Sequence, residues 1–192
     1  MARVLVHLCC GPCAIVPVSA LKAQGFEVTG YFSNPNIHPL TEYLRRRETL
    51  LQAARLLDIP VLFPDAEYQP RVFFQAVTGR EEERCPPCYA LRLEPTARAA
   101  REMGFTAFTT SLLYSKYQKH EAIRQAGLAA AQAQGLDFLY QDFREGWKEG
   151  VTRSKEWGLY RQQYCGCLYS EAERYARELA RAVAAETGLA PS

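Results

Sequence analysis

The chain has 192 residues, of which 48% are hydrophobic, and a formal net charge of +2 at neutral pH. This length and composition favour one domain, residues 1–192, with a buried core of its own, and the small charge neither requires nor excludes a nucleic-acid partner. No apolar run approaches the roughly 20 residues that span a bilayer, and the N-terminus lacks the pattern of a signal peptide. We therefore expect a cytoplasmic protein without membrane contact.

The expected elements alternate between strands and helices along the chain. Pro95 is expected to kink a helix or to start a new one, and residues 144–164 show no clear period. The alternation predicts an α/β Rossmann-like sandwich with about five parallel strands. Strands are predicted at residues 3–8, 26–32, 61–63, 105–110 and 138–143, and helices at 14–24, 41–58, 89–103 and 119–134, followed by a last helix that opens in a capping box of Ser170 and Glu173 and ends before Gly188.

Seven cysteines in a chain expected in the reducing cytosol indicate metal binding or redox chemistry rather than a disulfide frame. Cys9, Cys10 and Cys13 follow the first predicted strand, at the sheet edge where open α/β folds bind ligands. The turn at Gly11-Pro12 allows two adjacent thiols to serve one site. The alternative is that these cysteines are small apolar core residues.

Cys85 and Cys88 form a C-x-x-C motif with two prolines inside it, and we expect it in a loop. This spacing brings both sulfurs to one metal or cluster. The alternative is a redox pair of the thioredoxin type, but such a pair normally opens a helix directly after a strand, whereas a charged loop without an apolar run, residues 78–84, precedes this one. With Cys9 and Cys10, the motif supplies four thiolates, which suit zinc or an iron–sulfur cluster. The adjacent pair favours the cluster, because a cluster spreads over several irons.

Cys165 and Cys167 are separated by one glycine. Such a pair can close a small, strained disulfide ring, and Gly166 can adopt the backbone angles that the ring requires. Strain makes such a disulfide easy to reduce, which suits a redox cycle. The alternatives are further cluster ligands or plain surface thiols.

The remaining polar candidates are histidines and basic residues. His7 lies inside a predicted strand and is interpreted as a core residue, His38 lies in a proline-rich loop where it could line a pocket, and His120 is expected to be solvated. A further set could contact phosphates or form ordinary solvated helix faces: Arg45, Arg46, Arg47, Lys116, Lys119 and Arg124.

Five segments, taken in order, resemble the epoxyqueuosine reductases of the QueH type, a cobalamin-independent family of tRNA queuosine synthesis. Together they span nearly the whole chain, so the match is specific, although each motif alone would be weak. The segments are Cys9-Cys10-Gly11-Pro12-Cys13, Asn34-Pro35-Asn36-Ile37-His38-Pro39, Cys85-Pro86-Pro87-Cys88-Tyr89, Thr109-Thr110-Ser111-Leu112-Leu113 and Tyr160-Arg161-Gln162-Gln163-Tyr164-Cys165-Gly166-Cys167.

The resemblance implies a fold similar to the adenine nucleotide α-hydrolase group and an iron–sulfur site within it. It implies a [4Fe-4S] cluster held by Cys9, Cys10, Cys85 and Cys88, and a redox-active disulfide between Cys165 and Cys167. Cys13 stands where the ligand of an additional iron would be expected. The implied substrate is tRNA with a queuosine-type wobble base, and the electron donor is unidentified.

The implied chemistry agrees with the residue types. Reduction of an epoxide to an alkene and water consumes two electrons and two protons, which one dithiol releases on oxidation, and an electrophilic iron would weaken the C–O bond. Tyr160, Arg161 and Tyr164 beside the dithiol are candidates for stacking the base, with His38 a further substrate contact. Two other functions remain open: a general thiol–disulfide oxidoreductase and a zinc-binding RNA module.

Overall fold

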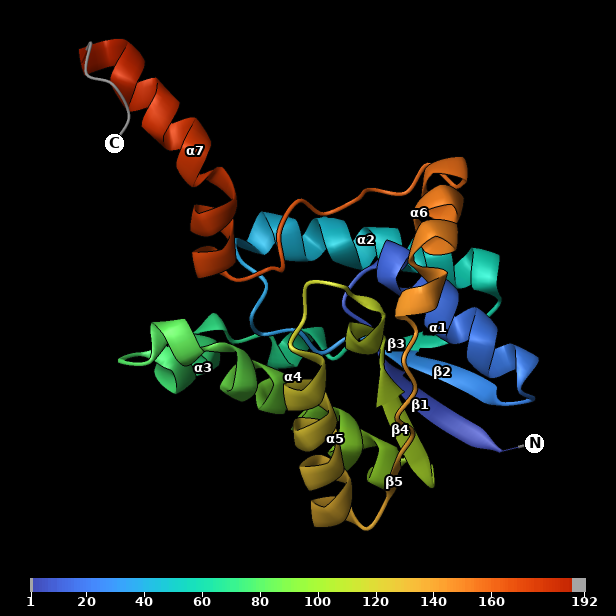
Figure 1. Ribbon diagram of the computed structural model, residues 1–192. Coiled ribbons are helices and arrows are strands. Elements are labelled where there is room, and N and C mark those ends of the chain that lie inside the picture. The colour runs from blue at the N-terminus through green and yellow to red at the C-terminus, as the bar shows by residue number, and fades with distance from the viewer. Residues whose placement is uncertain (1, 188–192) are drawn as a thin grey trace.

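The computed structural model describes residues 2–187, apart from the side chain of Glu67. Its centre is a parallel sheet of five strands in the order β3-β2-β1-β4-β5 (Figure 1). The predicted α/β class and parallel sheet are therefore confirmed. The strands are β1 (Arg3–His7), β2 (Glu27–Tyr31), β3 (Val61–Leu62), β4 (Ala107–Thr110) and β5 (Asp137–Phe138).

β1 occupies the middle of the sheet and sets the position of the site. It pairs with β2 on one side and β4 on the other, and Val4, Leu5 and Val6 are fully buried. A strand covered on both faces is apolar at successive positions, as this one is. The order of the strands reverses beside β1, and in open α/β sheets such a point binds ligands at the carboxyl ends of the strands. β1 ends at this edge, and Cys9 and Cys10 follow its end after one intervening residue.

Helices cover both faces of the sheet. α1, α2 and α6 pack together on one face, α4 and α5 pack together on the other, and α7 projects from the body (Figure 1). The helices are α1 (Gly11–Ala23), α2 (Leu40–Leu57), α3 (Pro70–Val77), α4 (Cys85–Glu102), α5 (His120–Gln134), α6 (Trp147–Glu156) and α7 (Leu168–Thr187), with short 3-10 turns η1 (Asp65–Glu67), η2 (Glu81–Glu83), η3 (Ser111–Tyr114) and η4 (Arg144–Gly146).

The expectation that the C-x-x-C motif lies in a loop is wrong. Cys85 is the first residue of α4, and the following prolines occupy its first positions. Proline suits these positions, because its fixed φ is helical and its missing N–H would have no partner there. α4 also continues through Pro95, so no new helix begins at that residue. The motif thus opens a helix, as in a redox pair, but it follows the 3-10 turn η2 rather than a strand.

The C-terminal third differs most from expectation. β5 ends at Phe138 rather than residue 143, and residues 144–164 contain η4 and α6. Between α6 and α7 the chain has no regular structure, and we call residues 157–167 the strap. The predicted capping box is wrong, because α7 begins at Leu168 and the Cys167 sulfur accepts the N–H of Ser170 at 3.4 Å. Gly188, before which the last helix was expected to end, lies outside the described residues.

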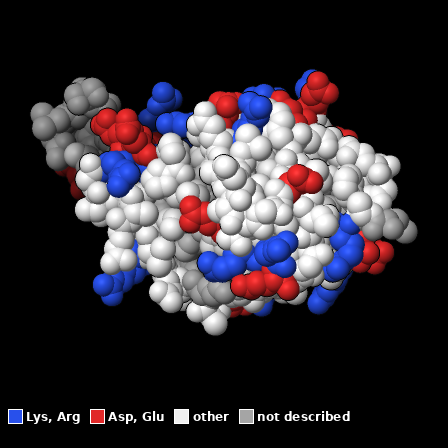
Figure 2. Space-filling model, turned by 90° about the horizontal axis from the view of Figure 1, so that it is seen from below, with Lys and Arg blue, Asp and Glu red and all other residues white. Residues whose placement is uncertain are grey.

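Charge is mixed on the face seen in Figure 2, which views the molecule from below. Lys and Arg side chains alternate there with Asp and Glu around a broad uncharged area. None of the helices within residues 2–187 combines the length and apolar character needed to cross a membrane.

Candidate active site

The first cysteine group consists of Cys9, Cys10 and Cys13. The three side chains are buried, and their sulfur atoms all lie within 4.8 Å of one another. Cys10 caps α1 by accepting the N–H of Cys13 at 3.4 Å. The chain can turn here because Gly11 has no side chain: a Cβ at that position would lie 2.6 Å from the carbonyl oxygen of Thr49 on α2. This turn brings adjacent cysteines to one site, and the group could hold a metal.

The fold shifts the pKa values of these three cysteines in different directions. Hydrogen bonds from the Cys10 and Cys13 thiols hold the pKa of Cys9 well below its usual value. Burial raises the pKa of Cys10, and its interactions with the other two sulfurs raise the pKa of Cys13. Cys9 is therefore the sulfur of the three that most readily carries negative charge, and a soft metal would displace the protons of the other two on binding.

The second cysteine group consists of Cys85, Cys88, Cys165 and Cys167. The first turn of α4 supplies two of these, and the end of the strap supplies the others. Cys88 and Cys167 are buried in one apolar cluster with Phe73, and burial raises the pKa of Cys88 to about 12. Cys165 is exposed, and its sulfur accepts the side-chain N–H of Gln118 at 3.1 Å. All seven cysteines are free thiols, so the predicted disulfide between Cys165 and Cys167 is not formed in this structure.

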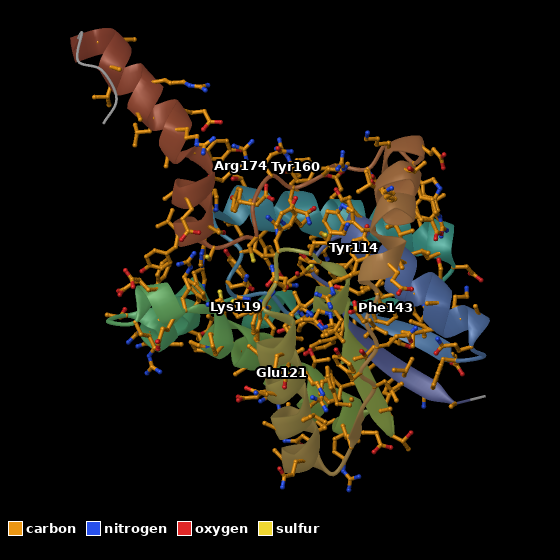
Figure 3. All side chains as sticks on the ribbon, viewed as in Figure 1. Tyr114, Lys119, Glu121, Phe143, Tyr160 and Arg174 are labelled. Carbon is orange, nitrogen blue, oxygen red and sulfur yellow. The ribbon has the colours of Figure 1, made fainter. Side chains whose placement is uncertain are left out.

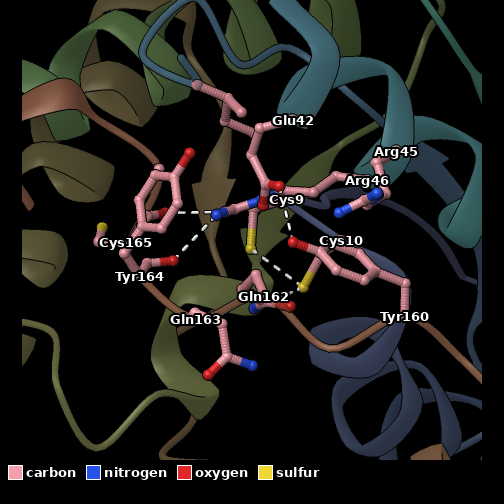
Figure 4. Close-up of polar contacts among 12 residues, drawn as sticks. Cys9, Cys10, Glu42, Arg45, Arg46, Tyr160, Gln162, Gln163, Tyr164 and Cys165 are labelled. Atoms are coloured by element: carbon pink, nitrogen blue, oxygen red, sulfur yellow. Dashed lines mark hydrogen bonds and ion pairs between the residues drawn. The ribbon is translucent and has the colours of Figure 1, made fainter. Parts of the chain in front are cut away.

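Arg46 fixes the strap to α2. Its side chain is 1% exposed, and its Nε donates to Glu42 at 2.6 Å. The two terminal nitrogens donate to the backbone carbonyls of Cys165 at 2.8 Å and Tyr164 at 2.9 Å (Figure 4). Glu42 also accepts the Tyr160 hydroxyl at 2.7 Å. The buried ion pair of Arg46 and Glu42 thus holds the strap at Tyr160 and again at residues 164 and 165.

Arg92 lies between the two cysteine groups. It is 1% exposed, and its Nε donates to the carbonyl of Cys88 at 3.1 Å. Burial opposes its charge, but the nearby sulfurs of Cys88, Cys165 and Cys9 outweigh burial and raise the pKa of Arg92. Among the described residues, its Nη2 has no hydrogen-bond partner. A buried cation with a free donor favours negative charge beside it.

One cavity of about 680 Å³ joins both groups, since Cys9, Cys13, Arg92 and Cys165 all line it. Over its floor, the side-chain N–H of Gln162 donates to the sulfurs of Cys10 and Cys13 at 3.0 and 3.3 Å. Around its mouth, Tyr114 lies beside α6 and Arg174 on α7 (Figure 3), while the strap and the turn after η3 complete the rim. The walls are Tyr114, Tyr117, Trp147, Arg161, Tyr164 and Arg174.

The four predicted substrate residues do not all lie in one place in the structure. Arg161 and Tyr164 line the cavity, whereas Tyr160 lies in a smaller neighbouring hollow. His38 is buried, and its ring stacks on Phe74 with centroids 4.8 Å apart. It does not line the cavity, although its carbonyl accepts the Tyr164 hydroxyl at 2.6 Å and thereby supports the strap.

The other histidines and the arginine triplet are placed by their contacts. His7 is the satisfied core residue that was expected: it bonds Thr110 at 2.9 Å, and burial lowers its pKa to about 4. The expectation that His120 is solvated is wrong, because its ring is 10% exposed and bonds the carbonyl of Leu113. Arg46 is buried and cannot meet a phosphate, and Arg47 pairs with Asp65 at 2.8 Å. The triplet is therefore not a basic patch.

The sequence analysis did not single out several residues that line or support the cavity. Arg92 follows Cys88 by four residues, so it would have been found had the C-x-x-C motif been placed at the start of a helix. Tyr117 and Trp147 lie in segments without a regular pattern and gave no comparable signal. Glu42 and Gln162 gain their roles only from contacts across the fold.

Comparisons with known proteins bear on this site. The family described as "Epoxyqueuosine reductase QueH" matches residues 4–173. Relatives with that name include one from Histophilus somni, 38% identical over 88% of this chain and 72% of its own, and one from Dehalococcoides mccartyi, 35% identical over 91% of this chain and 96% of its own. A solved structure described as a predicted subunit of tRNA methyltransferase from Methanocaldococcus jannaschii has a TM-score of 0.51 at 15% identity, covering 100% of this chain and 91% of that one. This last likeness concerns the fold alone.

Proposed function

The chain belongs to the epoxyqueuosine reductase QueH family and is an oxidoreductase that reduces epoxyqueuosine in queuosine biosynthesis; from this premise, we propose that the epoxide is reduced in the cavity between its two cysteine groups. One observation carries the proposal: Cys9 and Cys13 of the first group and Cys165 of the second line the same cavity. A substrate held there would meet a metal site on one side and a dithiol on the other.

We propose that Cys9, Cys10, Cys85 and Cys88 hold a [4Fe-4S] cluster and that Cys13 holds an additional iron. Cys9, Cys10 and Cys13 fit such a group, because they are buried with their sulfurs within 4.8 Å of one another and thiolates are the ligands that iron–sulfur clusters use. Cys85 and Cys88 are not part of this close set and would add their thiolates from the first turn of α4. Bound iron would supply a Lewis acid for the epoxide oxygen. Cys10 and Cys85 also stand at the starts of α1 and α4, where the helix dipole favours negative charge.

Arg92 would balance the charge of this centre. Thiolates and a cluster together bring negative charge into a buried site, which is costly without a nearby cation. Arg92 is buried beside Cys88, and its Nη2 is free to donate a hydrogen bond. Arg92 would therefore act as a positioning residue that stabilises the loaded centre.

Cys165 and Cys167 would provide the electrons. Two C–O bonds of the epoxide and two S–H bonds break; one C=C bond, one S–S bond and the two O–H bonds of water form. The oxygen leaves as water, and the dithiol becomes a disulfide, so atoms and electrons balance. Gly166 has a φ of +139°, a conformation that favours glycine and leaves the short loop between the sulfurs free of a side chain. A reductant from outside the chain would then restore the dithiol.

The macromolecular substrate that best agrees with this cavity is tRNA with epoxyqueuosine at its wobble position. The anticodon loop is single-stranded, so its bases can turn out and enter a protein cavity. Arg161 and Arg174 at the mouth could meet its phosphates, while Tyr164 and Tyr160 lie along the strap beside them. We propose that this reaction takes place in the cytosol, and that residues 1–192 act as one domain.

Anaerobic purification followed by iron and sulfide analysis, together with turnover of tRNA containing epoxyqueuosine, tests the proposal. We expect a brown protein with about four irons or more per chain that converts the epoxide to the alkene. A colourless protein with zinc would favour the RNA-binding module, and reduction of protein disulfides without metal would favour the general thiol–disulfide oxidoreductase. Either result, without epoxide turnover, would contradict the proposal.

A further inference from the structure

Beyond the cysteines, the cavity has an aromatic rim that the reaction itself does not use. Tyr117 is 85% exposed and lies in the turn between η3 and α5. Its ring meets that of Trp147, the first residue of α6, with centroids 5.7 Å apart and planes at 80°. Both side chains line the cavity mouth. A large aromatic side chain held this far into solvent contributes little to the core, which points to a contact outside the chain.

Trp147 is held firmly beneath this exposed ring. Tyr114 stacks on it with centroids 5.1 Å apart, and the Tyr114 hydroxyl donates to the Trp147 carbonyl at 3.2 Å. Gly150, one turn along α6, permits this packing, because a Cβ there would lie 2.2 Å from the Tyr114 oxygen. The rim is thus a stacked ring pair, Tyr114 and Trp147, that carries one exposed ring, Tyr117, at its outer edge.

The charges around this rim are those that a nucleic-acid backbone requires. The Lys116 nitrogen lies 5.9 Å from the centre of the Trp147 ring, and Arg161 and Arg174 line the same mouth. The acidic residue among the lining side chains, Glu173, is paired with Arg84. Aromatic faces interleaved with cations are the arrangement by which proteins bind single-stranded nucleic acid, since bases stack on the rings and phosphates meet the cations.

We propose that Tyr117 and Trp147 form a stacking subsite for an unmodified nucleobase of the anticodon loop, next to the base that enters the cavity. This inference rests on the proposed function, because it takes the single-stranded loop of a tRNA as the occupant. Stacking of a neighbouring base would separate it from the modified base and hold the loop open over the cysteines. The subsite tolerates any base, since every base presents a flat ring face.

Fluorescence of Trp147 reports on this subsite directly, because the chain has two tryptophans and Trp157→Phe leaves one. An anticodon stem-loop RNA with an unmodified wobble base is titrated into that variant, with and without Tyr117→Leu. We expect the RNA to quench Trp147, and Tyr117→Leu to weaken binding by about tenfold, while Tyr117→Phe restores it. Tyr140→Leu is the matched control, because Tyr140 is 45% exposed and lies outside the cavity lining.

Absence of quenching, or equal affinity of the Tyr117→Leu and parent proteins, would overturn the inference.

Turnover of tRNA containing epoxyqueuosine separates this failure from that of the proposed function. If the parent protein turns over and Tyr117→Leu raises KM with little change in kcat, the subsite is supported. If the parent turns over and KM is unchanged, only the subsite is refuted. A parent protein that makes no product would contradict the proposed function itself. Concentration-dependent self-association that Tyr117→Leu abolishes, without any effect on RNA binding, would assign the rim to contact between copies of the chain.

Discussion

The two cysteine groups differ in how the fold brings them together. The first group is local: Cys9 and Cys10 lie between the central strand β1 and α1, and Cys13 lies in the first turn of α1. The second group joins the start of α4 to the end of the strap, segments about 80 residues apart in sequence. All three cysteines of the local group are buried, whereas the composite group includes the exposed Cys165.

This difference indicates a division of roles. Rigid, buried thiols at a sheet edge suit a resident metal, because their positions are fixed by secondary structure. A thiol on an irregular segment, open to the cavity, suits a group that must change its bonds in each turnover and meet an external reductant. Cys85 and Cys88 belong to the composite group in space but to the metal in our proposal, so they test the division most severely. Cys88 is the buried one of the two.

Replacing Cys88 should have the largest effect on metal content. Cys88→Ala removes one of four proposed cluster ligands, so we expect almost complete loss of iron, measured after anaerobic purification. Cys13→Ala is the matched control, since it should lose only the additional iron and keep the cluster. Full iron in Cys88→Ala, with loss of iron in Cys13→Ala, would instead show that the first cysteine group is a complete metal site without α4.

Arg92→Met should affect the loaded and metal-free proteins in opposite directions. Without metal, removing a buried cation that has an unpaired nitrogen is neutral or stabilising. With metal, the same change removes the nearby positive charge, so iron should leave several times faster to an added chelator. Equal rates of iron release from Arg92→Met and the parent protein would show that the guanidinium does not stabilise the centre.

The strap should depend on Arg46 for its order. Arg46→Met leaves Glu42 buried without its cation and two carbonyls without a donor, so we expect a loss of about 3–5 kcal/mol in the free energy of unfolding. Chemical denaturation measures this loss. The exposed neighbour Arg45→Met should change the same quantity by about 0.5 kcal/mol or less. Similar losses in both variants would mean that the buried ion pair does not anchor the strap.

Binding of tRNA should weaken as salt rises, because phosphates release counterions when they meet basic side chains. For contacts with a single strand, each lost phosphate contact lowers the slope of log affinity against log salt by about 0.7. Arg161→Gln and Arg174→Gln should each do so, whereas Arg98→Gln, on an exposed part of α4 outside the cavity lining, should not. A salt-independent affinity would contradict a phosphate contact at the mouth.

The local group was predictable from sequence because its geometry depends on neighbouring residues. A buried strand followed by Cys9-Cys10-Gly11-Pro12-Cys13 fixes both the sheet edge and the turn. By contrast, the position of Cys165 depends on Arg46, 119 residues away, and an irregular segment has no periodic pattern that predicts such a contact.

Two errors have simple physical causes. The prolines of Cys85-Pro86-Pro87-Cys88 favoured a loop, yet proline is also favoured in the first turn of a helix. The run Arg45-Arg46-Arg47 was a candidate for phosphate contact, but successive residues of a helix point in different directions and do not share a face. One of the three is accordingly buried, and another forms a surface ion pair.

The central claim, that the metal and the dithiol are separate parts of one site, is tested by the double variant Cys165→Ser/Cys167→Ser. We expect it to retain the iron content of the parent protein and to bind tRNA, but to form no product over multiple turnovers, because the two electrons and two protons for each epoxide would be missing. Iron content and product are measured on the same sample. Product formation at the parent rate would contradict the role of the dithiol, and loss of the iron would show that these cysteines are ligands of the metal.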